Sequence, residues 1–447
     1  AGLVALSSTT IAGNETVALI ADIDLTGVTL TATTKPWTGV FNGQGYALKN
    51  WTSSKGLFVL NCGTVKNIVI DESCKLTLPV ITAAAMIGFV VDQNTGLVSG
   101  CVNNADITLN HEADLALQYK VGAIVGYSSG AGKVSNCINN GDITMTFPAI
   151  TAASDYLGGV VGNTSMADAS SVAVENCINN GDLTFTVKGA SKNVYLAGIS
   201  GSCNSKDLIN NCINNGAVVY NFIAGGSGAY PNVGGIVGYQ GNSTADRTCN
   251  VVNCVSYGDV HGYKTCAGGV VGTISSYGTA NILDCKSFGN VTCSQYSVGG
   301  IVGSATVKVE TTINNCIAYG KLAGQHSIGG IVGYVKPNDA ACVVNIINSV
   351  YAGRRIEARG NNGNNGYTLV AGIVGWAQVT AGTLNILNCA SRVDEIHTVS
   401  TATDGYASKN NAMAGIIGFQ NGTPVKATIH GVYSTIKWDG FHTDGIS

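Results

Sequence analysis

Short runs of three to five apolar residues, rich in Ile and Val and bounded by Gly or Asn, recur along most of the chain. One recurring phrase reads small–Gly–apolar–apolar–Gly, as at 234–238 and 268–272, and returns about every 30–43 residues. Amphipathic helices need about ten or more periodic residues without Gly, and the chain offers no convincing stretch of that kind. Gly and Asn tolerate the left-handed conformation of tight turns. The pattern therefore predicts short strands separated by turns.

A second phrase, apolar–x–Asn–Cys–apolar–Asn–Asn–Gly–Asp–apolar, lies between copies of the first and is best formed at 134–143, 174–183 and 209–218. Its cysteines are Cys101, Cys137, Cys177, Cys212, Cys254, Cys285, Cys316 and Cys389, with Ser349 replacing Cys once. The asparagines before them are Asn136, Asn176, Asn211, Asn253, Asn315, Asn348 and Asn388. Residues that recur once per coil would stack about 4.8 Å apart, and stacked Asn side chains can hydrogen-bond along the axis.

A repeat of this length predicts a solenoid, in which each coil covers the apolar face of its neighbour. We expect an all-β chain folded as a right-handed parallel β-solenoid (β-helix) of about ten irregular coils with an atypical N-terminal cap. Residues 1–80 carry no repeat and are interpreted as entry coils and cap. Residues 81–431 are the solenoid repeats, and residues 432–447 are a C-terminal cap or a segment donated to another subunit.

The direction of the repeated cysteine is a separate question. Strict alternation from Val134 would place Asn136 and Ile138 inside and Cys137 outside. Lys286 occupies the position of Ile138 in another coil, which indicates that this position faces water. A bend at the asparagine would return Cys to the interior, and this is the orientation we expect. Stacked thiols without His or acidic neighbours are interpreted as packing, so no metal site is predicted.

Two further features of the sequence, a pair of cysteines outside the repeated phrase and the glycosylation sequons, give weaker predictions. Cys266 and Cys293 lie in adjacent predicted coils and are a candidate disulfide. Asn-x-Ser/Thr sequons, candidate glycosylation sites, begin at Asn14, Asn50, Asn163, Asn242, Asn290 and Asn421. Several would carry glycan in a secreted eukaryotic chain and would mean little in a bacterium, and chance in an Asn/Thr-rich chain also explains many of them.

The composition and charge exclude several classes of function. Charged residues make up 11% of the 447 residues, against roughly 25% in a typical soluble domain. The formal net charge is −3 without a basic patch, so we expect no nucleic-acid partner. No run of about 18 apolar residues occurs, and no membrane span is expected. The chain opens at Ala1 without a signal-like segment, as expected if a leader was removed. A surface of Asn, Thr, Ser and Gly favours an extracellular or cell-surface location.

The order of motifs resembles a known family. The segments ADIDLTG, W-x-G-x-F-N-G-Q-G-Y-x-L-K-N, GLF and GTVKNI precede the GGIVG phrases. This order resembles surface proteins with GLUG-type repeats over nearly the whole chain. The resemblance implies a β-solenoid stalk or adhesin, and it specifies an architecture rather than an activity. The chain departs from the pattern at 86–88, at Ser200 and after Cys389.

The sequence leaves two functions open. The first is an extracellular structural or adhesive surface protein, in its sharper form one that assembles end to end into a filament, with further copies or surface glycans and proteins as partners. The alternative is a carbohydrate-active β-helix enzyme, a polysaccharide lyase or glycoside hydrolase, which needs two converging carboxylates. The acids Asp106, Asp142, Asp182 and Asp259 instead hold one turn position, where Asp accepts backbone hydrogen bonds. We therefore predict no enzyme, no catalytic residue and no cofactor.

Overall fold

The structure is a computed structural model in which two compact units, residues 1–229 and 230–447, are described separately. It describes residues 15–30, 33, 35–77, 85–110, 118–150, 154–167, 172–189, 193–223, 230–242, 244, 247–359, 368–399, 411–421, 427–435 and 437–439. Every regular element in these ranges is a β-strand. Within the same ranges no helix has the length and hydropathy needed to cross a membrane.

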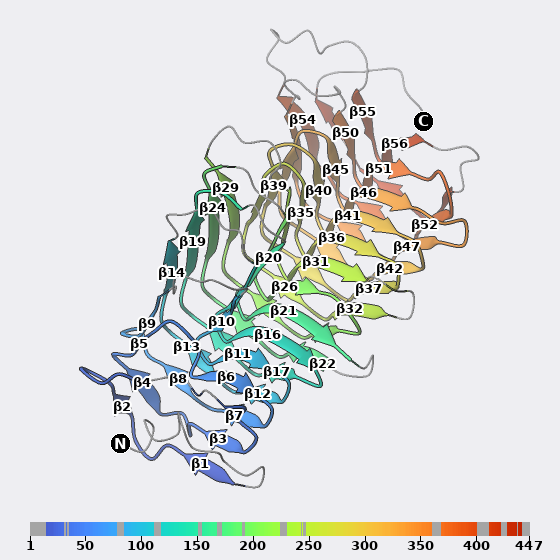
Figure 1. The fold of residues 1–447 in the computed structure, drawn as a ribbon. Coiled ribbons are helices and arrows are strands. Elements are labelled where there is room, and N and C mark those ends of the chain that lie inside the picture. The colour runs from blue at the N-terminus through green and yellow to red at the C-terminus, as the bar shows by residue number, and fades with distance from the viewer. Residues whose placement is uncertain are drawn as a thin grey trace. The chain divides into compact units, whose positions relative to one another are not determined.

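The strands of the first unit form five sheets, named A to E (Figure 1). Sheet A holds β1 (Thr16–Ala18), β3 (Val40–Asn42), β7 (Thr64–Lys66), β12 (Leu97–Ser99), β17 (Lys133–Ser135), β22 (Val172–Glu175) and β27 (Leu208–Asn210). Sheet B holds β2 (Ile23–Asp24), β4 (Ala47–Lys49), β8 (Val69–Ile70), β13 (Val102–Asn103), β18 (Ile138–Asn139), β23 (Ile178–Asn179) and β28 (Ile213–Asn214). Sheet C holds β6 (Phe58–Asn61), β11 (Val91–Asn94), β16 (Val125–Gly130), β21 (Val161–Met166) and β26 (Ser200–Cys203). Sheet D holds β5 (Thr52–Ser53), β9 (Lys75–Leu76), β14 (Ile107–Asn110), β19 (Ile143–Phe147), β24 (Leu183–Val187) and β29 (Val218–Phe222). Sheet E holds β10 (Ala85–Gly88), β15 (Tyr119–Gly122), β20 (Asp155–Gly158) and β25 (Asn193–Ala197).

The second unit has sheets of the same five kinds. Sheet A holds β32 (Thr248–Val252), β37 (Thr279–Leu283), β42 (Thr311–Asn314), β47 (Val343–Ile347), β52 (Thr383–Leu387) and β57 (Ala427–His430). Sheet B holds β33 (Val255–Ser256), β38 (Lys286–Ser287), β43 (Ile317–Ala318), β48 (Val350–Tyr351), β53 (Ala390–Ser391) and β58 (Tyr433–Ser434). Sheet C holds β31 (Val237–Asn242), β36 (Val271–Ser276), β41 (Val302–Val307), β46 (Val332–Pro337), β51 (Val374–Gln378) and β56 (Ile417–Asn421). Sheet D holds β34 (Val260–Gly262), β39 (Val291–Cys293), β44 (Leu322–Gly324), β49 (Arg355–Arg359), β54 (Glu395–Val399) and β59 (Lys437–Asp439). Sheet E holds β30 (Tyr230–Gly234), β35 (Cys266–Gly268), β40 (Ser297–Gly299), β45 (Ser327–Gly329), β50 (Thr368–Ala371) and β55 (Asn411–Ala414).

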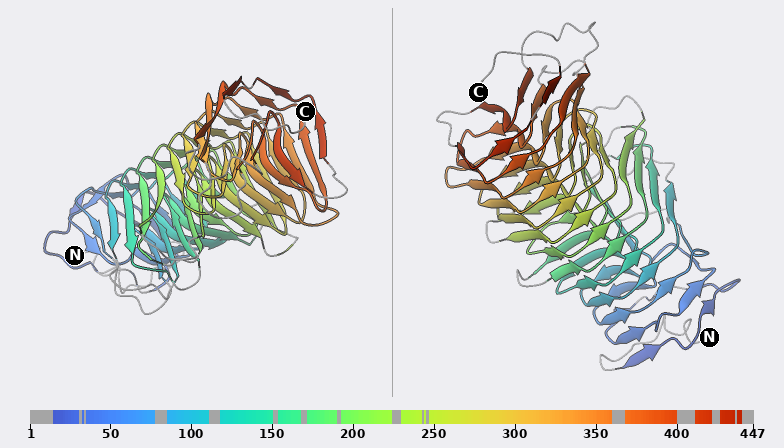
Figure 2. Two further views of the ribbon diagram at one scale, coloured as in Figure 1. Left: turned by 90° about the horizontal axis from the view of Figure 1, so that it is seen from above. Right: turned by 180° about the vertical axis from the view of Figure 1, so that it is seen from behind.

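Each coil visits the sheets in a fixed order and then returns one strand further along, so neighbouring strands in a sheet are parallel (Figure 2). In sheet A of the first unit, for example, Val65 pairs with Val98 and Val98 with Val134. All three side chains are 0% exposed. Apolar residues of successive coils therefore form continuous buried columns, because one coil alone cannot bury its own apolar face. The predicted parallel β-solenoid is confirmed.

The Gly-rich phrase makes the corner between sheets E and C, where backbones approach too closely for a side chain. A Cβ on Gly272 would lie 2.5 Å from the Gly238 oxygen and 2.7 Å from the Val233 nitrogen. Real Cβ contacts are not this short, so the phrase requires glycine there for close backbone approach. This explains why the closing glycine of the phrase recurs with every coil.

The two ends of the chain join this arrangement differently. Among the described residues, 15–77 supply strands to sheets A, B, C and D, and the first strand of sheet E is β10. At the other end, β58 pairs with β53 and β59 with β54 in the same chain. The expected division at residues 80/81 and 431/432 remains a prediction, and the compact units divide instead between residues 229 and 230.

Candidate functional site

The residue before each repeated cysteine bends the chain; it is Gly100 before Cys101, Asp284 before Cys285, and asparagine before the others. Its φ is 54° at Asn136, 53° at Asn176 and 54° at Asn315, in the left-handed region that Asn tolerates better than most residues. The others behave alike: Asn211, Asn253, Asn348 and Asn388 have φ between 50° and 55°. Amide bonds between the side chains of this column are uneven in length, from 2.7 Å between Asn211 and Asn176 to 3.4 Å between Asn388 and Asn348. Asn348 donates to Asn314 rather than to Asn315. The bend is therefore the main role of this asparagine.

The bend turns the following cysteine into the core. All eight side chains, those of Cys101, Cys137, Cys177, Cys212, Cys254, Cys285, Cys316 and Cys389, are at most 1% exposed. The Cys137 thiol donates to the carbonyl of Ser135 at 3.3 Å, and the other seven make the same bond two residues back at 3.2–3.6 Å. Ser349 keeps this bond through its hydroxyl, at 2.8 Å to Ile347. A position that accepts Ser or Cys alike is suited to packing and hydrogen bonding.

A stronger asparagine ladder lies two residues after the cysteine. Asn103, Asn139, Asn179 and Asn214 are 0% exposed and belong to sheet B. Each Nδ2 donates to the next Oδ1 at 2.8 Å from Asn103 to Asn214, and also to a backbone carbonyl of its own turn at 2.8 Å. This inner ladder was not predicted from the sequence. The repeated Asn-Asn pair after each cysteine was its signal, but which of the two faces inward depends on the bend before them.

The repeated aspartates act as turn acceptors. Asp106 Oδ1 accepts the backbone N–H of Asp142 at 2.8 Å, and Asp142 in turn accepts that of Asp182 at 2.8 Å. Asp259 accepts the N–H of Asn290 at 2.7 Å in the second unit. Each carboxylate therefore ties one turn to the next, and the predicted role of this column in backbone hydrogen bonding is confirmed.

Cys266 and Cys293, the candidate disulfide, are not bonded to each other in the structure. Cys266 stands beside Ser297 in sheet E, whereas Cys293 stands beside Gly262 in sheet D. Burial raises the pKa of both thiols, to about 11 for Cys293. All fifteen cysteines lie within the described residues, and none forms a disulfide.

The predicted glycosylation site at Asn163 is contradicted by the burial of its side chain. Asn163 is 3% exposed and its Oδ1 accepts from Asn204 Nδ2 at 3.0 Å, so a glycan has no access to it in the folded chain. Asn50 and Asn290 are exposed. The Oδ1 of Asn290 accepts the backbone N–H of Lys321 at 3.0 Å. Asn14 and the side chains of Asn242 and Asn421 lie outside the described residues.

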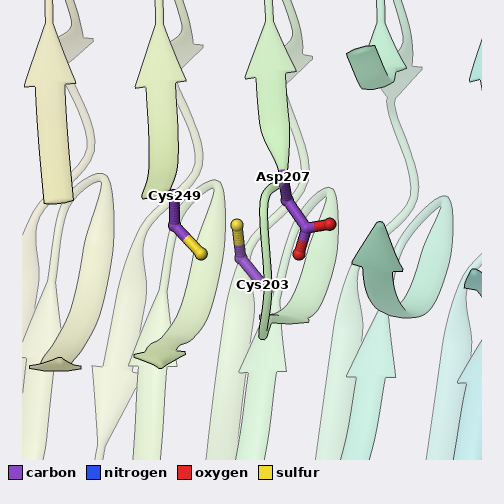
Figure 3. Close-up of side chains that lie close together, drawn as sticks. All are labelled: Cys203, Asp207 and Cys249. Atoms are coloured by element: carbon purple, nitrogen blue, oxygen red, sulfur yellow. The ribbon is translucent and has the colours of Figure 1, made fainter. Parts of the chain in front are cut away.

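Three buried carboxylates hold backbone amides in the first unit. Asp92 accepts from Gly56 and Gly88, and Asp155 from Tyr119, and burial raises the pKa of both to about 7. Asp207 lies close to Cys203 (Figure 3) and accepts from Met166 N at 2.7 Å and from Thr164 Oγ1 at 3.1 Å. Burial raises its pKa as well. Each acid thus accepts a backbone N–H from the preceding coil, unlike a pair of carboxylates that face one substrate.

Aromatic side chains of the second unit form two groups where a partner could bind. The junction cluster lies at the corner of sheets E and C and consists of Tyr296, His326, Tyr334 and Trp376. Ring centroids are 5.8 Å apart for Tyr296 and His326, 5.4 Å for His326 and Trp376, and 4.9 Å for Tyr334 and Trp376. Tyr296 is 48% exposed and His326 is buried.

The junction cluster is uncharged at neutral pH. Burial lowers the pKa of His326, whose Nδ1 lies 2.8 Å from Ser327 Oγ. Burial also raises the pKa of Tyr334 to about 12, and its hydroxyl donates to Gln378 Oε1. Ring faces beside hydroxyl and amide groups can bind a neutral polar ligand, and such mixtures of apolar and polar groups line ligand sites.

The second group, the outer stack, consists of Tyr257, Phe288 and Tyr319. They occupy the same place in three successive coils, three residues after the buried cysteine. Centroids are 4.9 Å apart for Tyr257 and Phe288 and 4.7 Å for Phe288 and Tyr319, with interplanar angles of 12° and 5°. The side chains are 51%, 38% and 41% exposed in that order. In the first unit this place is taken by Asn104, Asn140, Asn180 and Asn215, whose amides bond at 2.6–2.7 Å.

Comparisons with known proteins give little further guidance. No protein-family model and no curated protein matches the chain. The crystal structure of a putative immunoglobulin A1 protease from Bacteroides ovatus is similar at 13% identity and a TM-score of 0.28, covering 94% of this chain and 78% of that one. A TM-score this low carries no argument about function. The resemblance to GLUG-type repeat proteins stays a prediction.

Proposed function

We propose that the chain is an extracellular structural or adhesive surface protein whose copies assemble end to end. The stacking of coils through columns of like residues supports this proposal, because such a column can continue into another chain wherever its last member is uncovered. The resemblance to GLUG-type surface proteins and the low charge content support the same conclusion. Surface glycans or proteins are proposed as further partners, and the junction cluster is the surface that we propose for them.

The exposed end of one core column carries the proposal. In sheet A of the second unit, Ile313, Ile346 and Ile386 are paired in register and 0% exposed. Ile429 pairs with Ile386 as the next member of this column and is 45% exposed. Nearby, Tyr433 of β58 is 64% exposed and Phe419 of β56 is 39% exposed. Ile429 therefore occupies a core position and is the last described member of its column, whereas Tyr433 and Phe419 continue the outward-facing positions of Ala390 and Trp376.

A further coil would cover this edge. Strand edges offer unpaired backbone groups that another strand can bind. Covering a large apolar side chain stabilises an assembly by about 1.5–3 kcal/mol at most. A second copy of this chain would continue the same column with identical residues. Head-to-tail contacts of one kind generate open filaments when they do not close into a ring.

The test is sedimentation velocity and negative-stain electron microscopy of the purified chain over a wide range of concentrations. We expect filaments or higher oligomers for the wild type and their loss in Ile429→Lys, because a charge would be buried in the interface. Thr428→Lys is the matched control, since Thr428 is exposed on the same strand and its neighbour Asn385 is outside the apolar column. Monomers at all concentrations for the wild type, or an equal loss in both variants, would contradict the assembly.

The carbohydrate-active enzyme has no comparable support. Glycoside hydrolysis needs two carboxyl groups that flank one bond. The buried acids Asp92, Asp155 and Asp207 accept backbone N–H groups of the preceding coil. The exposed Asp106 and Asp142 do the same along the turn column. We therefore propose binding and assembly rather than catalysis.

A further inference from the structure

The outer stack ends at Tyr319, because the next coil has no aromatic residue at the same position. Tyr319 follows Phe288 at the same register place, and the next coil places Ala352 there, as the pairing of Ala318 with Tyr351 fixes. The backbone confirms this register, because Ala352 N donates to Ala318 O at 2.7 Å, just as Tyr319 N donates to Ser287 O at 2.8 Å. A methyl group thus stands where the column would otherwise carry a fourth ring.

A cationic side chain follows on the other side of this gap. Tyr351 pairs with Ser391, and Arg392 N donates to Tyr351 O at 2.7 Å, so Arg392 is the column member after Ala352. Arg392 is exposed. Successive coils are about 4.8 Å apart, so position 352 lies one coil spacing from Tyr319 on one side and one coil spacing from Arg392 on the other.

From this register we propose that Tyr319, Ala352 and Arg392 form a binding place for one planar aromatic ring of a small aromatic acid. The existing rings show that this column stacks flat rings at 4.7–4.9 Å and nearly parallel. A ligand ring above Ala352 continues that stack on Tyr319 and receives the Arg392 guanidinium on its other face. The positive charge of Arg392 favours a ligand that also carries a carboxylate.

The height of the gap selects the ligand class. Two coil spacings, about 9.6 Å, separate position 319 from position 392, so one ring place at the spacing of the outer stack lies between them. A flat ring there offers a π-face to each neighbour, whereas a saturated ring offers none to the guanidinium. The place is also short along the column, because Phe288 already covers the other face of Tyr319. A small molecule with one ring system therefore fits better than an extended protein surface. This inference is independent of end-to-end assembly.

Saturation-transfer difference NMR on the full chain tests the proposal with indole-3-acetate as the probe. Cyclohexylacetate is the saturated counterpart, methyl glucoside is the sugar control, and a Gly-Trp-Gly peptide carries the same ring on a chain. We expect indole-3-acetate to bind the wild type and the other three to bind at least about tenfold more weakly. Binding of cyclohexylacetate or methyl glucoside as strong as that of indole-3-acetate would overturn a planar-ring site. A peptide that binds equally well would overturn the small-molecule assignment.

Variants locate the site. Ala352→Phe supplies the missing ring, and we expect it to weaken indole-3-acetate binding about tenfold or more while keeping or raising the thermal unfolding midpoint. This variant is informative because it should not unfold the chain. Tyr277→Ser is the matched control: Tyr277 is 48% exposed beneath Lys308 and lies outside the outer stack, so its loss should leave binding unchanged. Unchanged binding in Ala352→Phe, or an equal loss in Tyr277→Ser, would overturn the proposal.

Discussion

One residue decides which way the repeat faces. A strand that kept strict alternation from Val134 would send Cys137 to solvent, yet Cys137 is 0% exposed because Asn136 has a φ of 54°. The sequence indicated this bend through Lys286, which is exposed at the place that alternation assigns to the core. The inner ladder of Asn139 was not predicted, because its direction follows from the geometry of the bend rather than from residue type.

The bend can be tested by substitution at Asn176. Its φ of 53° lies in the left-handed region, which costs residues with a Cβ other than Asn and Asp about 1–2 kcal/mol. We expect Asn176→Ala to lower the free energy of unfolding by about that amount, and Asn176→Gly to lower it by only a few tenths of a kcal/mol. Urea unfolding followed by circular dichroism measures both. Equal losses for Ala and Gly would show that the amide bond at 2.7 Å to Asn211, rather than the backbone conformation, is what matters.

Buried Asp155 gives the fold a pH dependence. Burial raises its pKa from 3.8 to about 7, so below about pH 4 both the folded and the unfolded chain hold the proton and folding is not penalised. Between pH 4 and pH 7 the unfolded chain loses the proton first, and the folded state is destabilised, at most by about 4 kcal/mol. We expect the wild type to be more stable at pH 5 than at pH 8.

Asp155→Asn keeps the Oδ1 acceptor for Tyr119 N, at 2.7 Å in the wild type, and removes the charge. We therefore expect its unfolding free energy to depend less on pH and to exceed that of the wild type most clearly at pH 8. Asp142→Asn is the control, because Asp142 is exposed. Parallel pH profiles for wild type and Asp155→Asn in urea unfolding would rule out this assignment.

At the scale of elements, almost all strands of sheet B are only two residues long, yet they carry a fully buried polar column. Asn139 in β18 receives a bond from Asn103 and gives one to Asn179, both at 2.8 Å and both fully buried. Asn140, the next residue, makes a similar bond of 2.7 Å to Asn104 in solvent. Two adjacent asparagine ladders thus differ in burial, and the buried one also donates to the backbone carbonyls of its own turns.

This difference predicts unequal effects of substitution. Asn139→Ala leaves the buried Asn179 oxygen without its amide donor, and we expect a loss of about 2–3 kcal/mol in the free energy of unfolding. Asn140→Ala replaces an exposed bond by water, and we expect a loss below about 1 kcal/mol. Denaturant midpoints of the two variants measure the difference. Losses of equal size would mean that burial does not strengthen the ladder.

At the scale of the whole molecule, the period of the Gly-rich phrase predicted a parallel solenoid, because one short coil cannot bury its own apolar face and must be covered by the next. The partition into units 1–229 and 230–447 was not predictable, because the repeat continues through residue 229 without a change of phrase. The outer stack was visible as aromatic residues three places after Cys254, Cys285 and Cys316, but only the register shows that Ala352 interrupts it.

The central claim is that successive coils advance by one strand spacing in register. Thr16, Val40, Thr64, Leu97 and Lys133 are successive partners in sheet A of the first unit. Four steps of about 4.8 Å separate the first from the last, or about 19 Å between residues that are far apart in sequence. Double electron–electron resonance between genetically encoded spin labels at Thr16 and Lys133 measures this distance directly. A narrow distribution near 20 Å is the predicted result, and a broad one centred well above 30 Å would contradict the stacked-coil account.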